Sequence, residues 1–355
     1  MYHFRSAVKS ASHHRPYCSP GSKVTGIDME RLETYAKKTF LALKNPYCTV
    51  NQVNPRVIDL VAPSHEKHGF AWYTGVKDTS VIPGELKERL NENGFLFHTA
   101  DKMALGGRAV DLQLINPITG KWMTGSSSGT ALNVFYGIND AGIGTDGGGS
   151  VLAPAAALNL YGFISPLIEQ EHMKQYAKTS TDGIVFSPSL GAITRDLKTL
   201  EQVLNPLLGI NLKEESMNWE DGLEWKEVSN ENPPDIYGHR EPLIQFLNQI
   251  TGPGTILISK EGPVDVNAMG DSIYGHFDKE TETCQARSGK GLMRVVNMCE
   301  KSALTIPASK LGCCTLLICE SKKEDIEAMF RKARLMVCQR SQLIERYFMN
   351  FDMYF

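Results

Sequence analysis

Two short loops of glycine and hydroxyl-bearing residues, separated by an apolar stretch, constrain this chain more than any other feature of its sequence. Residues 124–130 read Thr-Gly-Ser-Ser-Ser-Gly-Thr, and residues 144–150 read Gly-Thr-Asp-Gly-Gly-Gly-Ser. Between them, residues 131–138 are small and apolar, which predicts a buried helix. Because two loops that flank one buried helix come to the same end of a sheet, we expect Ser126 and Ser150 to lie near each other.

The remaining pattern is typical of an α/β protein. Helices are expected over residues 28–44, 85–92, 153–160, 196–208 and 323–344, where apolar residues recur at helical spacing. Strands are expected over residues 71–76, 95–98, 255–258 and 314–318, which are short apolar runs. Strands that alternate with helices favour a layered α/β fold.

The division of the chain follows from its length and local composition. We expect a single domain over residues 28–345, preceded by a flexible extension over residues 1–27. The first 23 residues contain four basic residues and no acidic one, so they also resemble a transit peptide, although a plain extension is the preferred interpretation. Residues 211–241 are polar and acidic and contain Trp219 and Trp225, which indicates an excursion or a lid.

Composition excludes several classes of function. The 37 basic and 40 acidic residues give no overall attraction to nucleic acid or to a membrane surface. No run of 18 apolar residues occurs, so no membrane-spanning segment is expected. The eight cysteines form no CxxC pair, which argues against a zinc ribbon and favours reduced thiols in a cytoplasmic protein. We therefore expect neither a metal nor an organic cofactor.

The second loop has the composition of a site for acyl transfer. Successive glycines allow backbone N–H groups to converge, and N–H groups that converge beside a serine provide donors for an oxyanion next to a nucleophile. None of the nine histidines occurs in a recognisable catalytic dipeptide. A desolvated lysine is the other possible base, and Lys77 follows an expected strand at the start of a loop.

These motifs together resemble those of the amidase signature family of serine amidohydrolases. The family signature runs G-G-S-S-[GS]-G-S and, about twenty residues later, G-T-D-x-G-G-S, with a V-K-D motif upstream that corresponds to Val76-Lys77-Asp78. Three further segments resemble parts of the family pattern: Asn116-Pro117, Ser189 to Asp196 and Asn297 to Pro307. The resemblance covers roughly residues 28–340 and implies a mixed central sheet covered by helices on both faces.

The resemblance also implies a role for each matching residue. Ser150 would be the nucleophile, Lys77 the base, and Ser126 the relay between them, held by a cis peptide bond. The amides of Gly147, Gly148 and Gly149 would form the oxyanion hole. The supporting residues would be Ser127, which would help to hold the lysine, with Thr145 and Asp146, and Thr124 and Gly125 would contact the substrate.

The chain departs from the family pattern around these positions. Thr124 replaces the first glycine of the signature, and Leu152 replaces the arginine that follows the nucleophile by two residues. Whatever that arginine braces or binds is therefore missing. Arg108 and Arg294 could bind a carboxylate of the substrate, but nothing in their local sequence supports this role.

The predicted activity is that of an amidase, which hydrolyses a linear carboxamide rather than a peptide bond through an acyl-enzyme intermediate. Two alternatives share the fold: an amidotransferase subunit that releases ammonia to a partner, and a non-catalytic binding protein. Residues 144–149 could instead bind phosphate, but their spacing fits no GxGxxG or GxxxxGK[ST] motif. The expected ligand is a small amide, and a homodimer is possible.

Overall fold

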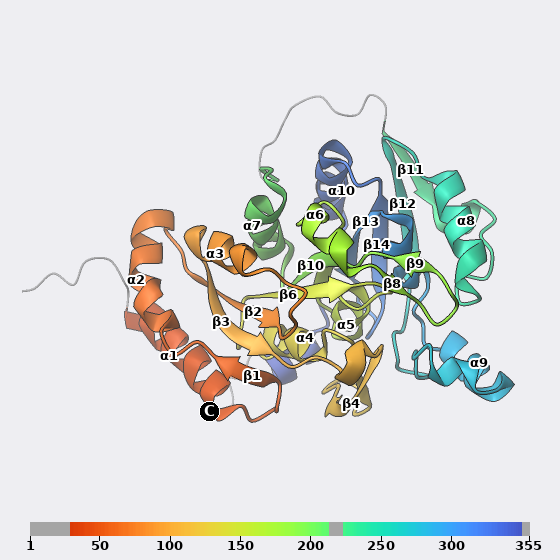
Figure 1. The fold of residues 1–355 in the computed structure, drawn as a ribbon. Helices are drawn as coiled ribbons and strands as arrows, with labels where there is room; N and C mark the ends of the chain where they lie inside the picture. Colours follow the sequence, from red (N-terminus) through yellow and green to blue (C-terminus); the bar gives the residue numbers. More distant parts are fainter. Residues whose placement is uncertain (1–28, 213–222, 350–355) are drawn as a thin grey trace, which may run out of the picture.

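The computed structural model describes residues 29–212 and 223–349, and a ten-stranded mixed sheet runs through this part of the chain (Figure 1). The strands lie in the order β1 (Val50–Val53), β3 (Phe95–Asp101), β2 (Trp72–Lys77), β6 (Ala141–Asp146), β10 (Ser189–Thr194), β7 (Tyr161–Ser165), β13 (Ser302–Pro307), β14 (Cys314–Cys319), β12 (Thr255–Glu261) and β11 (Glu224–Glu227). Strand β2 runs parallel to both β3 and β6, β11 runs parallel to β12, and the other neighbours are antiparallel. The expected α/β fold is confirmed.

Helices cover both faces of this sheet, because successive strand residues point to opposite sides. Phe163 packs in one buried cluster, whereas its neighbour Ile164 packs in the other. One face carries α4 (Ser128–Phe135), α5 (Leu152–Ala157), α8 (Arg240–Ile250) and α11 (Gln342–Ile344). The other face carries α3 (Gly84–Glu92), α6 (Gln170–Met173), α7 (Leu197–Leu208) and α10 (Lys323–Leu335). A smaller cluster packs α1 (Met29–Lys44) and α2 (Val57–His68) against β2 and β3.

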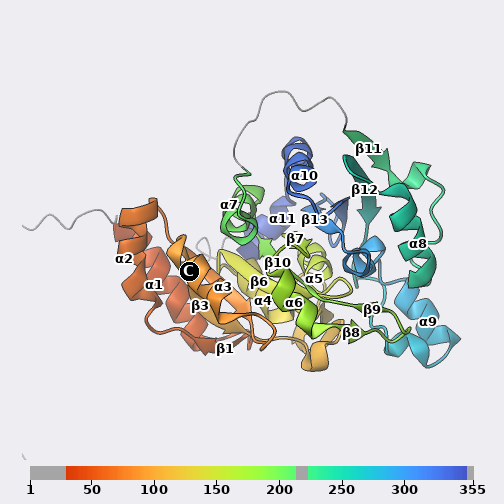
Figure 2. The same ribbon diagram turned by 45° about the horizontal axis from the view of Figure 1, so that its top comes forward.

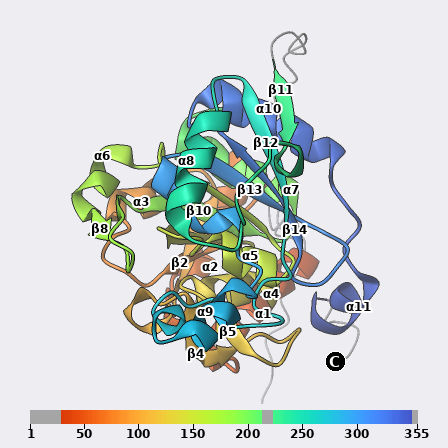
Figure 3. The same ribbon diagram turned by 90° about the vertical axis from the view of Figure 1, so that its right-hand side faces the viewer.

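Two hairpins and one helix lie outside this layered core. They are β4 (Val110–Ile115) with β5 (Trp122–Thr124), β8 (Lys178–Thr179) with β9 (Val185–Phe186), and α9 (Lys279–Ala286). The β8–β9 hairpin runs from α6 towards α9 (Figure 2), and α9 lies on the side of the molecule that faces the viewer in Figure 3. These elements surround the functional site described below.

Most expected elements are present, with two corrections. The helix expected over residues 323–344 ends at Leu335, and α11 is a separate short turn. The acidic segment 211–241 is not simply an excursion, because residues 224–227 form β11 at the edge of the main sheet. Trp225 lies under the ammonium of Lys332, 4.9 Å from its ring centre, and therefore packs beside α10 rather than over a pocket. Residues 1–28, and Trp219 with the rest of 213–222, lie outside the described residues.

The parallel strands β2 and β6 decide where chemistry can occur. Carboxyl ends of neighbouring parallel strands meet at one edge of a sheet, and the loops that follow them lie side by side. Strand β2 ends at Lys77 and β6 ends at Asp146. The V-K-D motif and the glycine-rich loop are therefore brought together from positions far apart in the sequence.

The close packing of the central strands gives a test of this architecture. Gly191 lies in β10, and a Cβ atom added to it would lie 2.2 Å from the carbonyl oxygen of Phe163 in the neighbouring strand. Because backbone cannot move aside cheaply, we expect Gly191→Ala to lower the free energy of unfolding by ~3 kcal/mol in urea denaturation. Gly84→Ala is the matched control, since no atom lies within 4 Å of its added Cβ. Equal stabilities for the two variants would contradict this packing.

Candidate active site

The two loops that the sequence singles out meet directly in space. Ser126 and Ser127 immediately precede α4, and Ser150 lies just before α5. The backbone amide of Ser127 donates to the carbonyl oxygen of Ser150 at 3.1 Å. The expectation that both loops come to one end of the sheet is confirmed.

Lys77 is buried against the first of these loops. Its side chain is 4% exposed, and its Nζ donates to Ser126 Oγ at 2.7 Å and to Thr145 Oγ1 at 2.9 Å. Burial lowers the pKa of Lys77 to about 7, while the Asp146 carboxylate raises this pKa and the nearby Lys178 ammonium lowers it. A large fraction of Lys77 is therefore neutral at neutral pH, which allows its nitrogen to accept a proton.

The segment before Ser126 has the backbone geometry that the family resemblance implies. The peptide bond between Gly125 and Ser126 is cis. The amide of Gly125 donates to the carbonyl of Ala109 at 2.8 Å, and the carbonyl of Ser126 accepts from the amide of Ala104 at 3.0 Å. These two bonds fix the backbone on either side of Ser126.

Asp146 organises the loop that carries Ser150. Its fully buried carboxylate accepts the amides of Gly149 at 2.7 Å, Val151 at 2.6 Å and Leu152 at 3.2 Å. Burial raises the pKa of Asp146, and these backbone donors act in the opposite direction by favouring the carboxylate. The turn around Ser150 is thus wrapped around a single side chain.

These contacts correct the expected oxyanion hole at one position. The N–H of Gly149 already has Asp146 as its acceptor, so it does not point freely towards the cavity. Within the described part of the chain, the amides of Gly147 and Gly148 make no hydrogen bond. They are the glycine donors that remain for an anion beside Ser150.

Packing also requires that residue 147 has no side chain. A Cβ atom there would lie 2.3 Å from the ring of Phe186, which comes from β9. The aromatic ring therefore occupies the space that any side chain at this position of the signature would take. Phe186 also lines the cavity above the loop, so it shapes the site where a substrate would bind.

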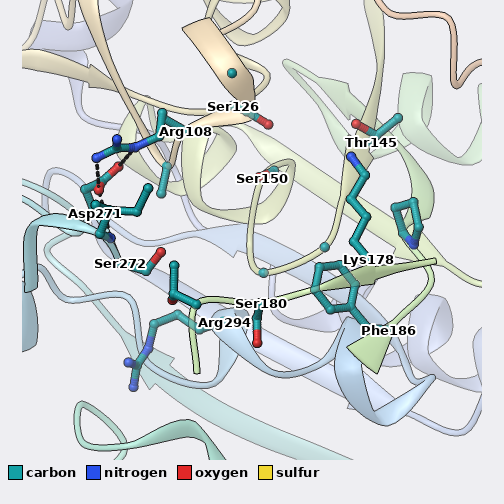
Figure 4. A pocket seen from close by; sticks show the side chains of 18 of the residues that line it. Arg108, Ser126, Thr145, Ser150, Lys178, Ser180, Phe186, Asp271, Ser272 and Arg294 are labelled. Atoms are coloured by element: carbon teal, nitrogen blue, oxygen red, sulfur yellow. Dashed lines mark hydrogen bonds and ion pairs between the residues drawn. The ribbon is translucent and has the colours of Figure 1, made fainter. Parts of the chain in front are cut away.

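A cavity of about 330 Å³ opens over these residues (Figure 4). Lys77, Ser126, Thr145 and Ser150 line one part of it, and Figure 4 shows Ser126 and Ser150 on adjacent loops. The remaining walls come from the β8–β9 hairpin, from residues 106–109, from residues 270–273 and from the 285–298 segment. The candidate site is therefore assembled from segments that are remote from one another in the sequence.

Three further site residues lie elsewhere than the resemblance implies. The Ser127 hydroxyl has no hydrogen-bond partner among the described residues and faces Gly144, so Thr145 rather than Ser127 holds the lysine. Thr124 donates to Asp265 at 2.7 Å behind the cavity wall. Gly125 is packed against the backbone of Arg108. Neither Thr124 nor Gly125 lines the cavity, so the structure gives no support to their predicted contact with substrate.

Sequence reasoning named Arg108 and Arg294, which line the outer cavity, but missed the other residues there. Arg108 forms a two-pronged ion pair with Asp271, whose other contacts are the amides of Ile273 and Tyr274 (Figure 4). Lys178 and Phe186 come from the β8–β9 hairpin. No short motif surrounds these residues, so only their assembly in three dimensions identifies them.

Histidines and clusters of metal-binding side chains are other groups that commonly support catalysis. No histidine lines the cavity, which leaves Lys77 as the base nearest to the two serines. The described residues contain no cluster of three or more histidine, cysteine or acidic side chains that could hold a metal ion. Among them there is also no helix of the length and hydrophobicity that crossing a membrane requires.

Comparisons with known proteins agree with this geometry. The model of the Amidase family matches residues 108–179, which include Ser126 and Ser150. No curated protein sequence matches the chain. Solved structures with a similar fold cover most of both chains. They include a subunit of the glutamyl-tRNA(Gln) amidotransferase from Thermotoga maritima, with 15% identity, 87% of this chain and 92% of that chain covered, and a TM-score of 0.59.

Two other similar structures are hydrolases by their descriptions. The native peptide amidase from Stenotrophomonas maltophilia is 13% identical, covers 91% of this chain and 99% of its own, and has a TM-score of 0.54. The structure of 6-aminohexanoate cyclic dimer hydrolase complexed with substrate is 14% identical and has a TM-score of 0.54. The match covers 88% of this chain and 95% of that chain. The fold of the chain is therefore that of solved amidase structures. The match of residues 108–179 to the Amidase family model spans both serine loops, so this part of the chain is similar to that family.

The role of Asp146 can be tested by stability. Asp146→Asn places N–H groups against backbone amides and removes a charged acceptor, so we expect the free energy of unfolding to fall by ~2 kcal/mol. Chemical denaturation of the purified protein measures this value. Asp59→Asn is the matched control, because Asp59 is 65% exposed in a loose ion pair and its loss should change stability by less than about 0.5 kcal/mol. A value for Asp146→Asn as small as the control would contradict the proposed bracing.

Proposed function

We propose that the chain hydrolyses a linear carboxamide through Ser150, Ser126 and Lys77. The observation that carries this proposal is the buried Lys77, bonded to Ser126 at the end of a cavity that Ser150 also lines. The match of residues 108–179 to the Amidase family model and the fold similarity to amidases support amide hydrolysis as the reaction. A lysine whose pKa lies near 7 is suited to act as a general base at neutral pH.

The first half of the reaction forms an acyl-enzyme. Neutral Lys77 takes the proton of Ser126, which in turn takes the proton of Ser150, and the Ser150 oxygen attacks the amide carbonyl. In this structure no hydrogen bond joins the two serine hydroxyls within the described residues. The bound substrate would bring them together, since catalytic hydrogen bonds tighten in the substrate complex.

The charge that develops on the carbonyl oxygen needs donors beside Ser150. The amides of Gly147 and Gly148 meet this need, and each well-placed donor can stabilise the transition state by ~3 kcal/mol. Asp146 supports them indirectly, because it holds the amides of Gly149 and Val151 and so fixes the turn. The C–N bond then breaks, and the leaving amine receives the proton that Lys77 returns through Ser126.

Water completes the cycle by the same relay. It loses a proton to Ser126 and Lys77, attacks the ester at Ser150 and releases the carboxylic acid. Each proton that Lys77 accepts is returned before the next turnover, so the reaction needs no other base. The products are an amine or ammonia and a carboxylate.

The fold similarity to an amidotransferase subunit supports a second candidate function. In that case the same residues would release ammonia from an amide for use by a partner protein. Affinity purification of the tagged chain from its native cells would separate the two candidates: a stoichiometric partner that raises amide turnover favours the amidotransferase role. A chain that is fully active alone favours the free-standing amidase.

The nucleophile is tested by covalent labelling. A fluorophosphonate reacts with an activated serine, so we expect the wild-type protein to be labelled and Ser150→Ala to lose both the label and amide turnover. Ser272→Ala is the matched control, because Ser272 lines the same cavity on the opposite wall. Intact-protein mass spectrometry measures the label, and a Ser150→Ala variant that is still labelled would rule out Ser150.

The base is tested by the dependence of rate on pH. Lys77 must be neutral to accept a proton, and its pKa lies at about 7 rather than 10.5, so kcat/KM should rise with pH and level off above about 8. Below pH 7 it should fall by about tenfold per pH unit, because the neutral fraction falls by that factor. Lys77→Met should be inactive, whereas exposed Lys67→Met should keep the wild-type profile. A profile that is flat from pH 5 to 9 would exclude Lys77.

A further inference from the structure

The cavity over Ser150 carries an excess of positive charge. One carboxylate, Asp271, lines it. The cationic side chains that line it are Lys77, Arg108, Lys178, Arg240, Lys290 and Arg294. Such an excess favours an anionic ligand only where a cation has no partner within the protein, so the partners of each one matter.

Three of these cations are neutralised by carboxylates at the cavity wall. Arg108 holds Asp271 through two nitrogens, as the dashed lines in Figure 4 mark. Arg240 donates to Asp182 at 2.7 Å, and also to Thr181 at 3.1 Å. Buried Lys290 pairs with Asp265 at 2.8 Å. None of the three presents an uncompensated charge to a substrate.

Two more cations have structural or chemical tasks. Arg294 donates to the carbonyls of Ile236 and Gly238, both at 2.9 Å, and so ties the start of α8 to the cavity wall. Its side chain points away from Ser150 in Figure 4. Lys77 contacts Ser126 and is the proposed base. Neither side chain is placed to bind a second group of the substrate.

Lys178 differs from the other five cations. Its ammonium makes no hydrogen bond or ion pair with any residue in the ranges 29–212 and 223–349. Figure 4 shows its side chain extending along the cavity towards Thr145, whose hydroxyl accepts a hydrogen bond from Lys77 at 2.9 Å. The hairpin that carries it is anchored on both sides, by Arg240 at Thr181 and by Phe186 against Gly147. A fixed strand thus presents one free positive charge to the reaction centre.

We propose that Lys178 binds a carboxylate of the substrate, so that the protein selects amides that carry a second, acidic group. The proposal rests on the function proposed above and names its substrate class. A carboxylate fits better than a phosphate, because one ammonium balances its single negative charge, whereas a phosphate group carries about −1.5 to −2 charges at neutral pH. The forks of Arg108 and Arg240 are occupied by Asp271 and Asp182, and a single ammonium remains.

The substrate preference is tested with matched amides. Succinamate, glutaramate and adipamate each carry a carboxylate, and their neutral diamides differ only at that group. We expect wild-type kcat/KM to favour the acids by about 30-fold, since a hydrogen bond to a charged group is worth one to two powers of ten. Lys178→Met should remove most of this preference through KM, and Lys178→Arg should restore part of it.

A neighbouring lysine provides the control for this experiment. Lys174 is exposed, pairs with Glu171 and does not line the cavity, so Lys174→Met should keep the wild-type preference. An acid-to-diamide ratio that is unchanged in Lys178→Met would overturn the proposal. A wild-type protein that prefers the diamides would do so as well.

Binding to an inactivated protein separates this proposal from the catalytic one. Calorimetry would measure glutarate binding to Ser150→Ala and to Ser150→Ala/Lys178→Met. Binding that is about 30-fold weaker in the double variant supports the carboxylate site even if no amide is hydrolysed, and equal binding overturns it. Inorganic phosphate is the third ligand: Lys178-dependent binding tighter than that of glutarate would overturn the choice of a carboxylate.

Discussion

The burial of the Lys77 amine at the end of β2 is the constraint on which the site depends. A charged ammonium is costly to bury, and here no carboxylate contacts it directly; its partners are the hydroxyls of Ser126 and Thr145. The protein therefore favours the neutral amine, and the pKa falls to about 7. The sheet supplies this environment, because β2 is covered by strands on both sides and ends where the serine loops begin.

Asp146, at the end of the neighbouring strand β6, is a second buried ionisable group on which the site depends. Its carboxylate raises the pKa of Lys77 from a distance while its oxygens are occupied by backbone amides of the Ser150 turn. One buried acid thus has two effects: it fixes the turn that carries the proposed nucleophile, and it keeps the lysine pKa from falling further. The geometry of the turn and the strength of the base are coupled through one side chain.

The sequence predicted the paired loops well because local composition encodes them. Runs of glycine and serine around a small apolar helix restrict the backbone strongly, and the V-K-D motif ends a strand with a readable apolar pattern. Hydrogen bonds are encoded less directly. Ser127 and Thr145 are both hydroxyl residues near the lysine, and only the direction of each side chain decides that Thr145 contacts it. The same limit applies to Gly149, whose amide turns towards Asp146.

The outer cavity is the part that the sequence could not predict, and it is also the part that would set substrate choice. Leu152 stands where the family pattern has an arginine, and it is fully buried in the apolar core as the first residue of α5. A charge at that position would have to be desolvated without a partner, so this chain cannot carry one there at low cost. The free positive charge instead comes from Lys178, on a hairpin 26 residues further along the chain. Because this hairpin lies outside the layered core, its residues can change without repacking the sheet. Lys178 also lowers the pKa of Lys77, so substrate preference and the strength of the proposed base are coupled through one side chain.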